Sequence, residues 1–183
     1  YPIESTASEE AAFRSGQLHI TTGIPIDKLA AYQTDPELNQ YLLQHTILAT
    51  YFYRFNVRKP PLDDVRVRRA LSLAIDREQL VNKVTLGGQM PARNLTPPGI
   101  AGYVAGDMMT GDLEEARQLL ADAGFPGGEG FPEMEILFNT SDGHRRIAEA
   151  IQQMWQQALG INVGLYNQEA RVQSNSMRDG NYT

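Results

Sequence analysis

Apolar residues recur at helical spacing in several parts of this chain. In residues 59–84, Val67, Ala70, Leu71 and Ala74 fall at positions i, i+3, i+4 and i+7, which predicts a helix with one buried face. A stripe of the same period runs through a longer stretch in the last third of the chain. We expect helices at 6–16 and 25–32, two within 59–84, two more at 111–124 and 141–160, and a last one from about Glu169.

Polar residues mark where these helices begin. Ser8 is the expected N-cap of the first helix, and Asp63 or Asp64 can accept hydrogen bonds from the free N–H groups of the helix that follows. Asp112, with Glu115 three residues later, has the spacing of a capping box. These signals are local, so they predict helix boundaries without reference to the rest of the fold.

Other segments show the pattern of strands. Residues 45–57, HTILATYFYRFNV, are β-branched and aromatic, and their nearly continuous apolar character indicates a strand covered on both faces. Residues 133–140 and 161–168 flank the helix at 141–160, so they should pair in parallel through a right-handed crossover. The fold class is therefore α/β, with a mixed sheet flanked by helices. The remaining expectations are strands at 1–5 and 17–22 and a long ordered loop at 89–111.

The composition of the chain argues against several classes of protein. The chain has 183 residues, of which 42% are hydrophobic and 21% charged, so it can bury a core and is not expected to be disordered. Its net charge of −6 argues against nucleic acid as a partner. It has no cysteine, which excludes disulfides and thiolate catalysis, and no apolar run near the roughly 20 residues that span a bilayer.

Four motifs, in order along the chain, resemble the family 5 extracellular solute-binding proteins, the peptide receptors of ABC importers. They are PPLDDVRVRRALSLAIDRE, then LVNKV with the later TPPGIAGY, then ARQLLADAGFPGG, and finally LFNTSDGHRRIAEAIQQMWQQALGINVGLYNQE. The resemblance extends over essentially the whole chain. It implies that the helix within 59–84 is scaffold, with arginines that hold neighbouring loops.

The resemblance also implies a place within a larger protein. Members of the family have two lobes that close on an extended peptide, in a type II-like periplasmic binding fold. Residues 1–48 resemble part of the first lobe and the crossover, and residues 49–183 resemble a partial second lobe that forms one compact unit. We therefore expect an internal fragment of a periplasmic receptor, separated from its leader, its missing lobe and its membrane ABC permease.

The same resemblance supplies candidate ligand-binding residues. Asn139 and His144, in the FNTSDGH segment, would lie near the peptide groove, and Tyr51, Tyr53 and Arg54 would line the cleft. An amide can pair with peptide backbone, a histidine with a ligand side chain or terminus, and an arginine with carboxylates. Each also has a purely structural interpretation: Asn139 and His144 as parts of a strand-to-helix turn, the tyrosines as core or rim aromatics, and the arginine as a solvated side chain.

The segment NQEARVQSNSMRDG departs from the family, which commonly has Trp after NQE, then an aromatic residue and a leucine. Here those positions hold Ala170, Gln173 and Ser174, and with Met177 they would form one helical face. One hypothesis is that these residues solubilise a truncated lobe, and natural drift is the alternative. Either way, an aromatic residue that could stack on a ligand is absent, which weakens the inherited binding site.

The functional prediction is short-peptide binding as part of an ABC-transporter receptor, without catalysis. No nucleophile motif, phosphate loop, cofactor motif or metal-ligand spacing accompanies the three scattered histidines. Two alternatives stay open. The chain could be an excised or engineered lobe that binds nothing by itself, or a receptor part for a dipeptide, a murein peptide, a nickel complex or a sugar. Unpaired sheet edges would also favour a homodimer of the fragment.

Overall fold

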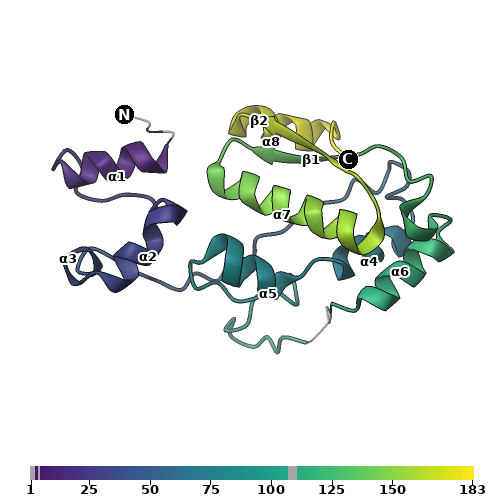
Figure 1. Cartoon of the computed structure of the whole chain (residues 1–183), viewed down its shortest axis with the longest axis horizontal. Helices are drawn as coiled ribbons and strands as arrows, with labels where there is room; N and C mark the ends of the chain where they lie inside the picture. Colours follow the sequence, from purple (N-terminus) through teal and green to yellow (C-terminus); the bar gives the residue numbers. More distant parts are fainter. Residues whose placement is uncertain (1–2, 4, 107–110) are drawn as a thin grey trace.

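The computed structural model describes residue 3, residues 5–106 and residues 111–183. Three helices near the amino terminus lie apart from the main body in Figure 1: α1 (Thr6–Arg14), α2 (Ile26–Thr34) and α3 (Pro36–Asn39). The N-cap of α1 is Ser5, whose side chain accepts from the backbone N–H of Ser8, so the prediction of Ser8 as the cap was wrong by three residues.

The strands expected at 17–22 and 45–57 are not found among the described residues. Residues 17–22 pair with no strand among the described residues, and the strand expected at 1–5 lies largely outside them, because only residues 3 and 5 of that segment are described. Residues 45–57 contain no strand and pair with no strand among the described residues. Nor are they covered on both faces, because Ile47 is 76% and Phe52 is 51% exposed. Apolar composition favours an extended backbone, but a strand also needs a neighbouring edge, and that is a nonlocal requirement.

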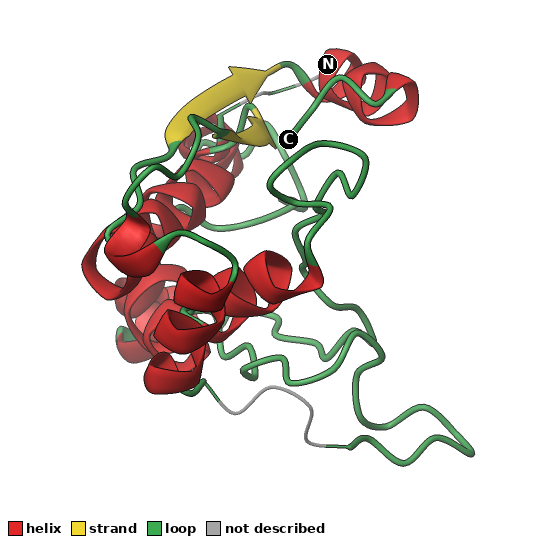
Figure 2. Cartoon of the chain, turned by 90° about the vertical axis from the view of Figure 1, so that its right-hand side faces the viewer, coloured by secondary structure: helices red, strands yellow, loops and turns green. Residues whose placement is uncertain are grey.

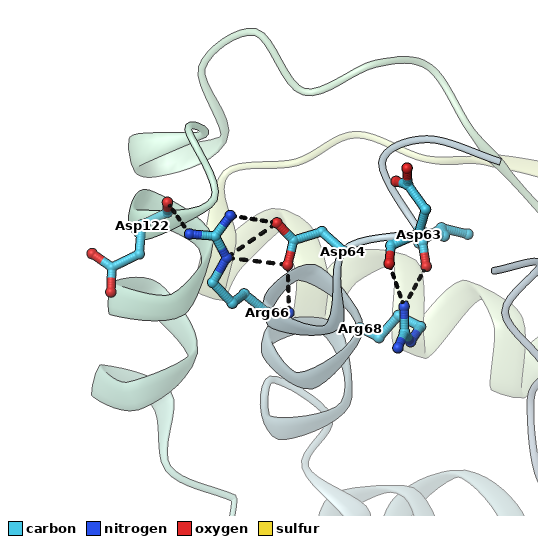
Figure 3. A network of polar contacts seen from close by, with 6 residues as sticks. Asp63, Asp64, Arg66, Arg68 and Asp122 are labelled. Carbon is cyan, nitrogen blue, oxygen red and sulfur yellow. Dashed lines mark hydrogen bonds and ion pairs between the residues drawn. The ribbon is translucent and has the colours of Figure 1, made fainter. Parts of the chain in front are cut away.

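Helix α4 (Val65–Leu73) begins as predicted, and Asp64 is the cap that the structure selects. The Asp64 side chain accepts from the backbone N–H of Arg66 at 2.8 Å. Arg66 and Arg68 hold neighbouring backbone, as expected (Figure 3): Arg66 donates to the carbonyl of Asp122 at 2.7 Å, and Arg68 to the carbonyls of Leu62 and Asp63 at 2.8 and 2.9 Å.

The chain continues through short helical segments and the long loop. These segments are α5 (Arg77–Gln79), the π-helix η1 (Leu80–Thr85), α6 (Leu113–Asp122) and the 3-10 helix η2 (Pro126–Gly128). The described residues of 89–111 form a loop, while 107–110 lie outside the described residues. Only half of the expected capping box is present. Asp112 accepts from the N–H groups of Glu114 and Glu115, but the Glu115 carboxylate pairs with Arg69 at 2.7 Å.

The predicted parallel unit is confirmed at the carboxyl-terminal end. Strand β1 (Glu135–Asn139) leads into α7 (Asp142–Leu159), and β2 (Gly164–Gln168) pairs with β1 in parallel, from Glu135 beside Gly164 to Asn139 beside Gln168. Helix α8 (Ala170–Asp179) follows with Glu169 as its N-cap. Among the described residues these two strands are the whole sheet, with α7 on one side of them and α8 along the other (Figure 1).

One core joins α4, α6, α7 and the sheet. Val67, Ala70 and Leu71 of α4 are buried, as the stripe predicted, and the Trp155 indole N–H of α7 donates to the Leu71 carbonyl at 2.8 Å. That carbonyl lies in the last turn of α4, where it has no partner within the helix. Figure 2 shows long loops that extend along one side of the main body. None of the described helices is long and apolar enough to cross a membrane.

Candidate binding site

The candidate site lies where β1 passes into α7. Asn139 is the last residue of β1, and after Thr140 the Ser141 side chain caps α7 by accepting from the backbone N–H of His144 at 3.5 Å. A strand-to-helix turn with an N-cap serine is the expected local consequence of this sequence. The turn places the side chains of Asn139 and His144 next to each other, although they are five positions apart in the sequence.

The two side chains make a direct polar contact. The Asn139 Oδ1 and His144 Nδ1 atoms are 2.5 Å apart. The Tyr51 ring lies over the imidazole, with centroids 5.2 Å apart and ring planes inclined by 36°. Tyr53 meets Tyr51 edge to face at 5.7 Å. The structure therefore brings four of the five predicted site residues into one connected cluster, from two segments far apart in sequence.

Burial changes the pKa values of three side chains in this cluster. Partial burial lowers the pKa of His144 below its usual 6.5, because the charged imidazolium loses hydration. Burial likewise raises the pKa of Tyr51 and, more strongly, that of Tyr53, where the neighbouring Tyr51 phenol adds to the effect. The Tyr53 hydroxyl is buried and makes no hydrogen bond to the described residues. All three side chains are therefore uncharged at neutral pH.

A cavity of about 230 Å³ continues from this cluster. Residues 51–55 and 134–139 line it, and Gln173 and Met177 of α8 contribute further lining. Arg54 lines the same cavity, but its guanidinium carbon lies 5.5 Å from the centre of the Phe52 ring. Arg54 therefore stacks on a neighbour in its own segment and is not part of the Asn139–His144 cluster.

The four positions of α8 on the face that departs from the family pattern differ in how buried they are. Gln173 and Met177 face the cavity and are half-buried, whereas Ala170 and Ser174 are exposed, and the Ser174 hydroxyl donates to the carbonyl of Ala170 at 2.9 Å. The four positions do not share one environment. That these residues solubilise the lobe stays a hypothesis.

Two polar residues near the site were missed by sequence reasoning. Gln168 pairs with Asn139 in the strand register, and its Oε1 atom is buried with no partner among the described residues. The register of the two predicted strands could have indicated this position. Buried Asn56 donates to the carbonyls of Gly180 and Tyr182 at 3.1 and 3.0 Å, which ties the end of the chain to residues 51–57. No sequence signal points to that contact.

The side chains of this site are of kinds that can bind a ligand. Within the described residues, no group of three or more His, Asp or Glu side chains is placed to hold a metal ion. What the site offers is an amide, an uncharged imidazole, phenol groups and an adjoining cavity. These are groups that bind a ligand by hydrogen bonds and stacking.

Comparison with protein families gives a match over residues 1–183, to the model described as "Bacterial extracellular solute-binding proteins, family 5 Middle". The periplasmic oligopeptide-binding protein OppA of Escherichia coli K12 is 35% identical over 192 aligned residues, which include 99% of this chain and 34% of that protein. The chain thus spans about a third of the length of the curated relatives that it matches.

Solved structures of related proteins have the same fold as this chain. The periplasmic oligopeptide-binding protein OppAIV of Borrelia burgdorferi superposes with a TM-score of 0.90 at 36% identity, over 98% of this chain and 35% of that one. Haemophilus influenzae OppA, in complex with the peptide RPPGFSPFR, gives a TM-score of 0.80 at 30% identity over 98% of this chain and 36% of that one. These relatives are solute-binding proteins.

Proposed function

Because this chain belongs to the bacterial extracellular solute-binding proteins of family 5, we propose that it forms part of a receptor that binds short peptides for an ABC transporter. The observation that carries the proposal is the match of nearly the whole chain to oligopeptide-binding relatives at about 35% identity. We propose a periplasmic location, in line with the names of those relatives, and no catalytic step.

We propose that the ligand contacts the cluster of Asn139, His144, Tyr51 and Tyr53, with Arg54 at the adjoining cavity. The Asn139–His144 pair is held between a strand and a helix, and the aromatic rings give it an apolar wall. Peptides offer N–H and C=O groups for such a site, and a cavity beside it can accept varied side chains through water.

We further propose that residues 1–48 belong to one lobe and residues 49–183 to the other. The main hydrophobic core contains no described residue before Tyr53, while Tyr32 is buried separately against Glu10. A peptide that contacts both lobes would favour the closed arrangement over the open one, and the transporter would recognise the closed form.

One alternative is a lobe that binds nothing by itself. It is favoured by the exposure of Tyr51, which is 52%, because a groove formed by one side alone leaves the ligand half in water. A second alternative is another solute, and relatives named for murein peptide and dipeptide binding make those the nearest candidates. Either alternative predicts that ordinary tripeptides fail to bind this chain.

The first test is a titration of the isotopically labelled 183-residue chain with tri-alanine and with longer peptides, followed by backbone amide NMR shifts. Saturable shifts at Asn139, His144 and residues 51–54 are expected. A well-dispersed spectrum that does not change would show that the fold forms but this chain does not bind peptides. Size-exclusion chromatography of the same sample would show whether a homodimer covers the site.

A further inference from the structure

We propose that Asn56 is a positioning residue, which holds residues 51–55 in place so that Tyr51 and Tyr53 reach the candidate site. Among the described residues, this segment has no strand to pair with, and its backbone makes no hydrogen bond. In a sheet the ladder fixes where the side chains point, so another contact has to do so here. Tyr53 and Phe55 pack against the core, but apolar packing is not directional.

The side chain of Asn56 supplies directional contacts at the end of this segment. Asn56 is 8% exposed, and its amide nitrogen donates to the carbonyl oxygens of Gly180 and Tyr182 at 3.1 and 3.0 Å. Its Oδ1 atom accepts from the backbone N–H of Arg58 at 3.3 Å. A primary amide is an uncharged group that offers two N–H donors on one atom, so it can serve both carbonyl groups. A buried side chain held by three hydrogen bonds also fixes the backbone that carries it.

The partners of Asn56 connect it to the sheet. Gly180 is the C-cap residue of α8, and α8 contacts β1. Tyr182 lines the same cavity as residues 51–55 and residues of β1. The Asn56 amide therefore joins the unpaired segment to β1 through the end of α8, which is a connection that a strand ladder would make directly in a sheet.

This anchor acts on the candidate site through Tyr51. The Tyr51 ring lies 5.2 Å from the His144 ring and meets Tyr53 edge to face, and Tyr51 is 52% exposed. Ring contacts of this kind are individually weak, so a half-exposed ring keeps its place only if its backbone is held. The effect of Asn56 on ligand affinity rests on the proposed peptide binding, whereas its effect on the position of Tyr51 does not.

The position of Tyr51 can be measured without any ligand. In the labelled 183-residue chain, nuclear Overhauser contacts between the Tyr51 and His144 rings report it. Asn56→Asp keeps the size of the side chain but removes both N–H donors, and Asn56→Ala removes the whole amide. Both variants should lose most of the intensity of these ring contacts, while Trp155 fluorescence still reports a folded core.

Gln152→Glu is the matched control. The Gln152 side chain also donates to a backbone carbonyl, that of Val163 at 2.6 Å, but this bond joins α7 to the chain just before β2. Its loss should lower the urea midpoint and leave the contacts between the Tyr51 and His144 rings unchanged. Ring contacts that persist in both Asn56 variants, or that weaken equally in Gln152→Glu, would overturn the proposal. An unfolded core in both Asn56 variants would overturn it as well, because Asn56 would then stabilise the fold as a whole.

A titration with tri-alanine separates this role from the proposed function. Asn56→Ala should bind tri-alanine about tenfold more weakly than the unaltered chain, because Tyr51 and Tyr53 would have to be ordered when the ligand binds. If tri-alanine does not bind the unaltered chain, peptide binding by this chain is overturned, and the ring contacts still decide whether Asn56 positions Tyr51. Equal affinity in the two proteins would leave the proposed function standing and overturn the link between Asn56 and the ligand.

Discussion

At the scale of single residues, two buried tyrosine hydroxyl groups differ in whether they have partners. The Tyr53 hydroxyl is buried without a hydrogen bond to the described residues, while the Tyr32 hydroxyl donates to Glu10 Oε1 at 2.9 Å. A buried polar group without a partner costs about 1–3 kcal/mol, and a satisfied one contributes. Sequence alone would treat the two residues alike.

This difference predicts opposite effects of the same substitution. Tyr53→Phe removes an unpaired hydroxyl, so the free energy of unfolding should stay the same or rise by up to about 1 kcal/mol. Tyr32→Phe is the control. It leaves the buried Glu10 carboxylate short of a donor and should lower the local stability by about 1–3 kcal/mol. Urea denaturation followed by Trp155 fluorescence measures the effect of Tyr53→Phe. Amide hydrogen exchange in α1 and α2 measures the effect of Tyr32→Phe.

A ligand role for Tyr53 would appear in the same experiment. If its hydroxyl binds peptide, Tyr53→Phe should weaken tri-alanine binding by roughly tenfold even though the fold is no less stable. A substantial loss of stability in Tyr53→Phe would contradict the structure, because it would mean that the hydroxyl has a partner within the protein.

At the scale of elements, the close approach of two turns controls how α7 meets the rest of the core. Gly160 follows α7 with a φ of +72°, and a Cβ atom there would overlap the carbonyl oxygen of Gly127. A Cβ at Gly128 would lie 2.6 Å from the Gly160 carbonyl group. The backbones of the η2 turn and the α7 end thus touch directly, which only glycine allows.

Gly160→Ala should therefore destabilise the chain by about 3 kcal/mol or more, the sum of left-handed strain and steric overlap. Gly180 is a matched control, because it follows α8 with a φ of +74° and a Cβ atom there would meet nothing within 4 Å. Gly180→Ala carries the strain alone, about 1–2 kcal/mol. Thermal denaturation of the two variants gives the comparison. Equal losses would mean that the two turns do not touch.

At the scale of the whole molecule, the amino-terminal helices and the main core are stabilised by different interactions. Glu10 is buried, accepts from the Tyr32 hydroxyl and pairs with Lys28 at 2.5 Å, which joins α1 to α2. The core around Trp155 contains none of these residues. Acid should therefore loosen the two parts at different pH values.

The Glu10 carboxyl group determines how the stability of α1 and α2 changes with pH. The hydrogen bond from Lys28, and secondarily that from Tyr32 with the charges of Lys28 and Arg14, lowers the pKa of Glu10 in the folded state. The stability that it contributes is complete above its ordinary pKa of 4.5 and is lost as the pH falls through the lowered value. Below pH 4.5, amides of α1 and α2 should lose protection against exchange, measured relative to the intrinsic exchange rate at each pH, while Trp155 fluorescence stays unchanged.

Glu10→Gln tests this assignment. It removes the charge, so α1 and α2 should exchange roughly tenfold faster at about pH 6 and lose most of their dependence on acid. Glu37→Gln replaces an exposed acid in α3 and is the control. It should change neither the exchange rate of α1 and α2 nor the dependence of that rate on pH. Simultaneous loss of Trp155 fluorescence would show that the amino-terminal helices and the core unfold as one unit.

The sequence by itself determined the elements whose causes are local. The stripe of α4, the Asp112 cap of α6 and the start of α8 at Glu169 follow from spacing and capping within short windows. The parallel pair of strands around α7 was predicted from the order strand, helix, strand along the chain. The family also followed from sequence, because four motifs occur in the expected order. The Asn139–His144 turn was visible as a candidate, although its geometry was not.

The tertiary structure alone decided everything that depends on a distant partner. Among the described residues, it left 45–57 without a strand to pair with. It also turned Glu115 toward Arg69 instead of the helix cap, and it brought Tyr51 onto His144 from a distant part of the chain. It also left the Tyr53 hydroxyl without a partner among the described residues and placed Arg54 on Phe52. The physical reason is common to all of these. Helix spacing and caps are satisfied within a few residues, whereas strand edges, ion pairs and ring contacts depend on which surfaces the packed chain brings together.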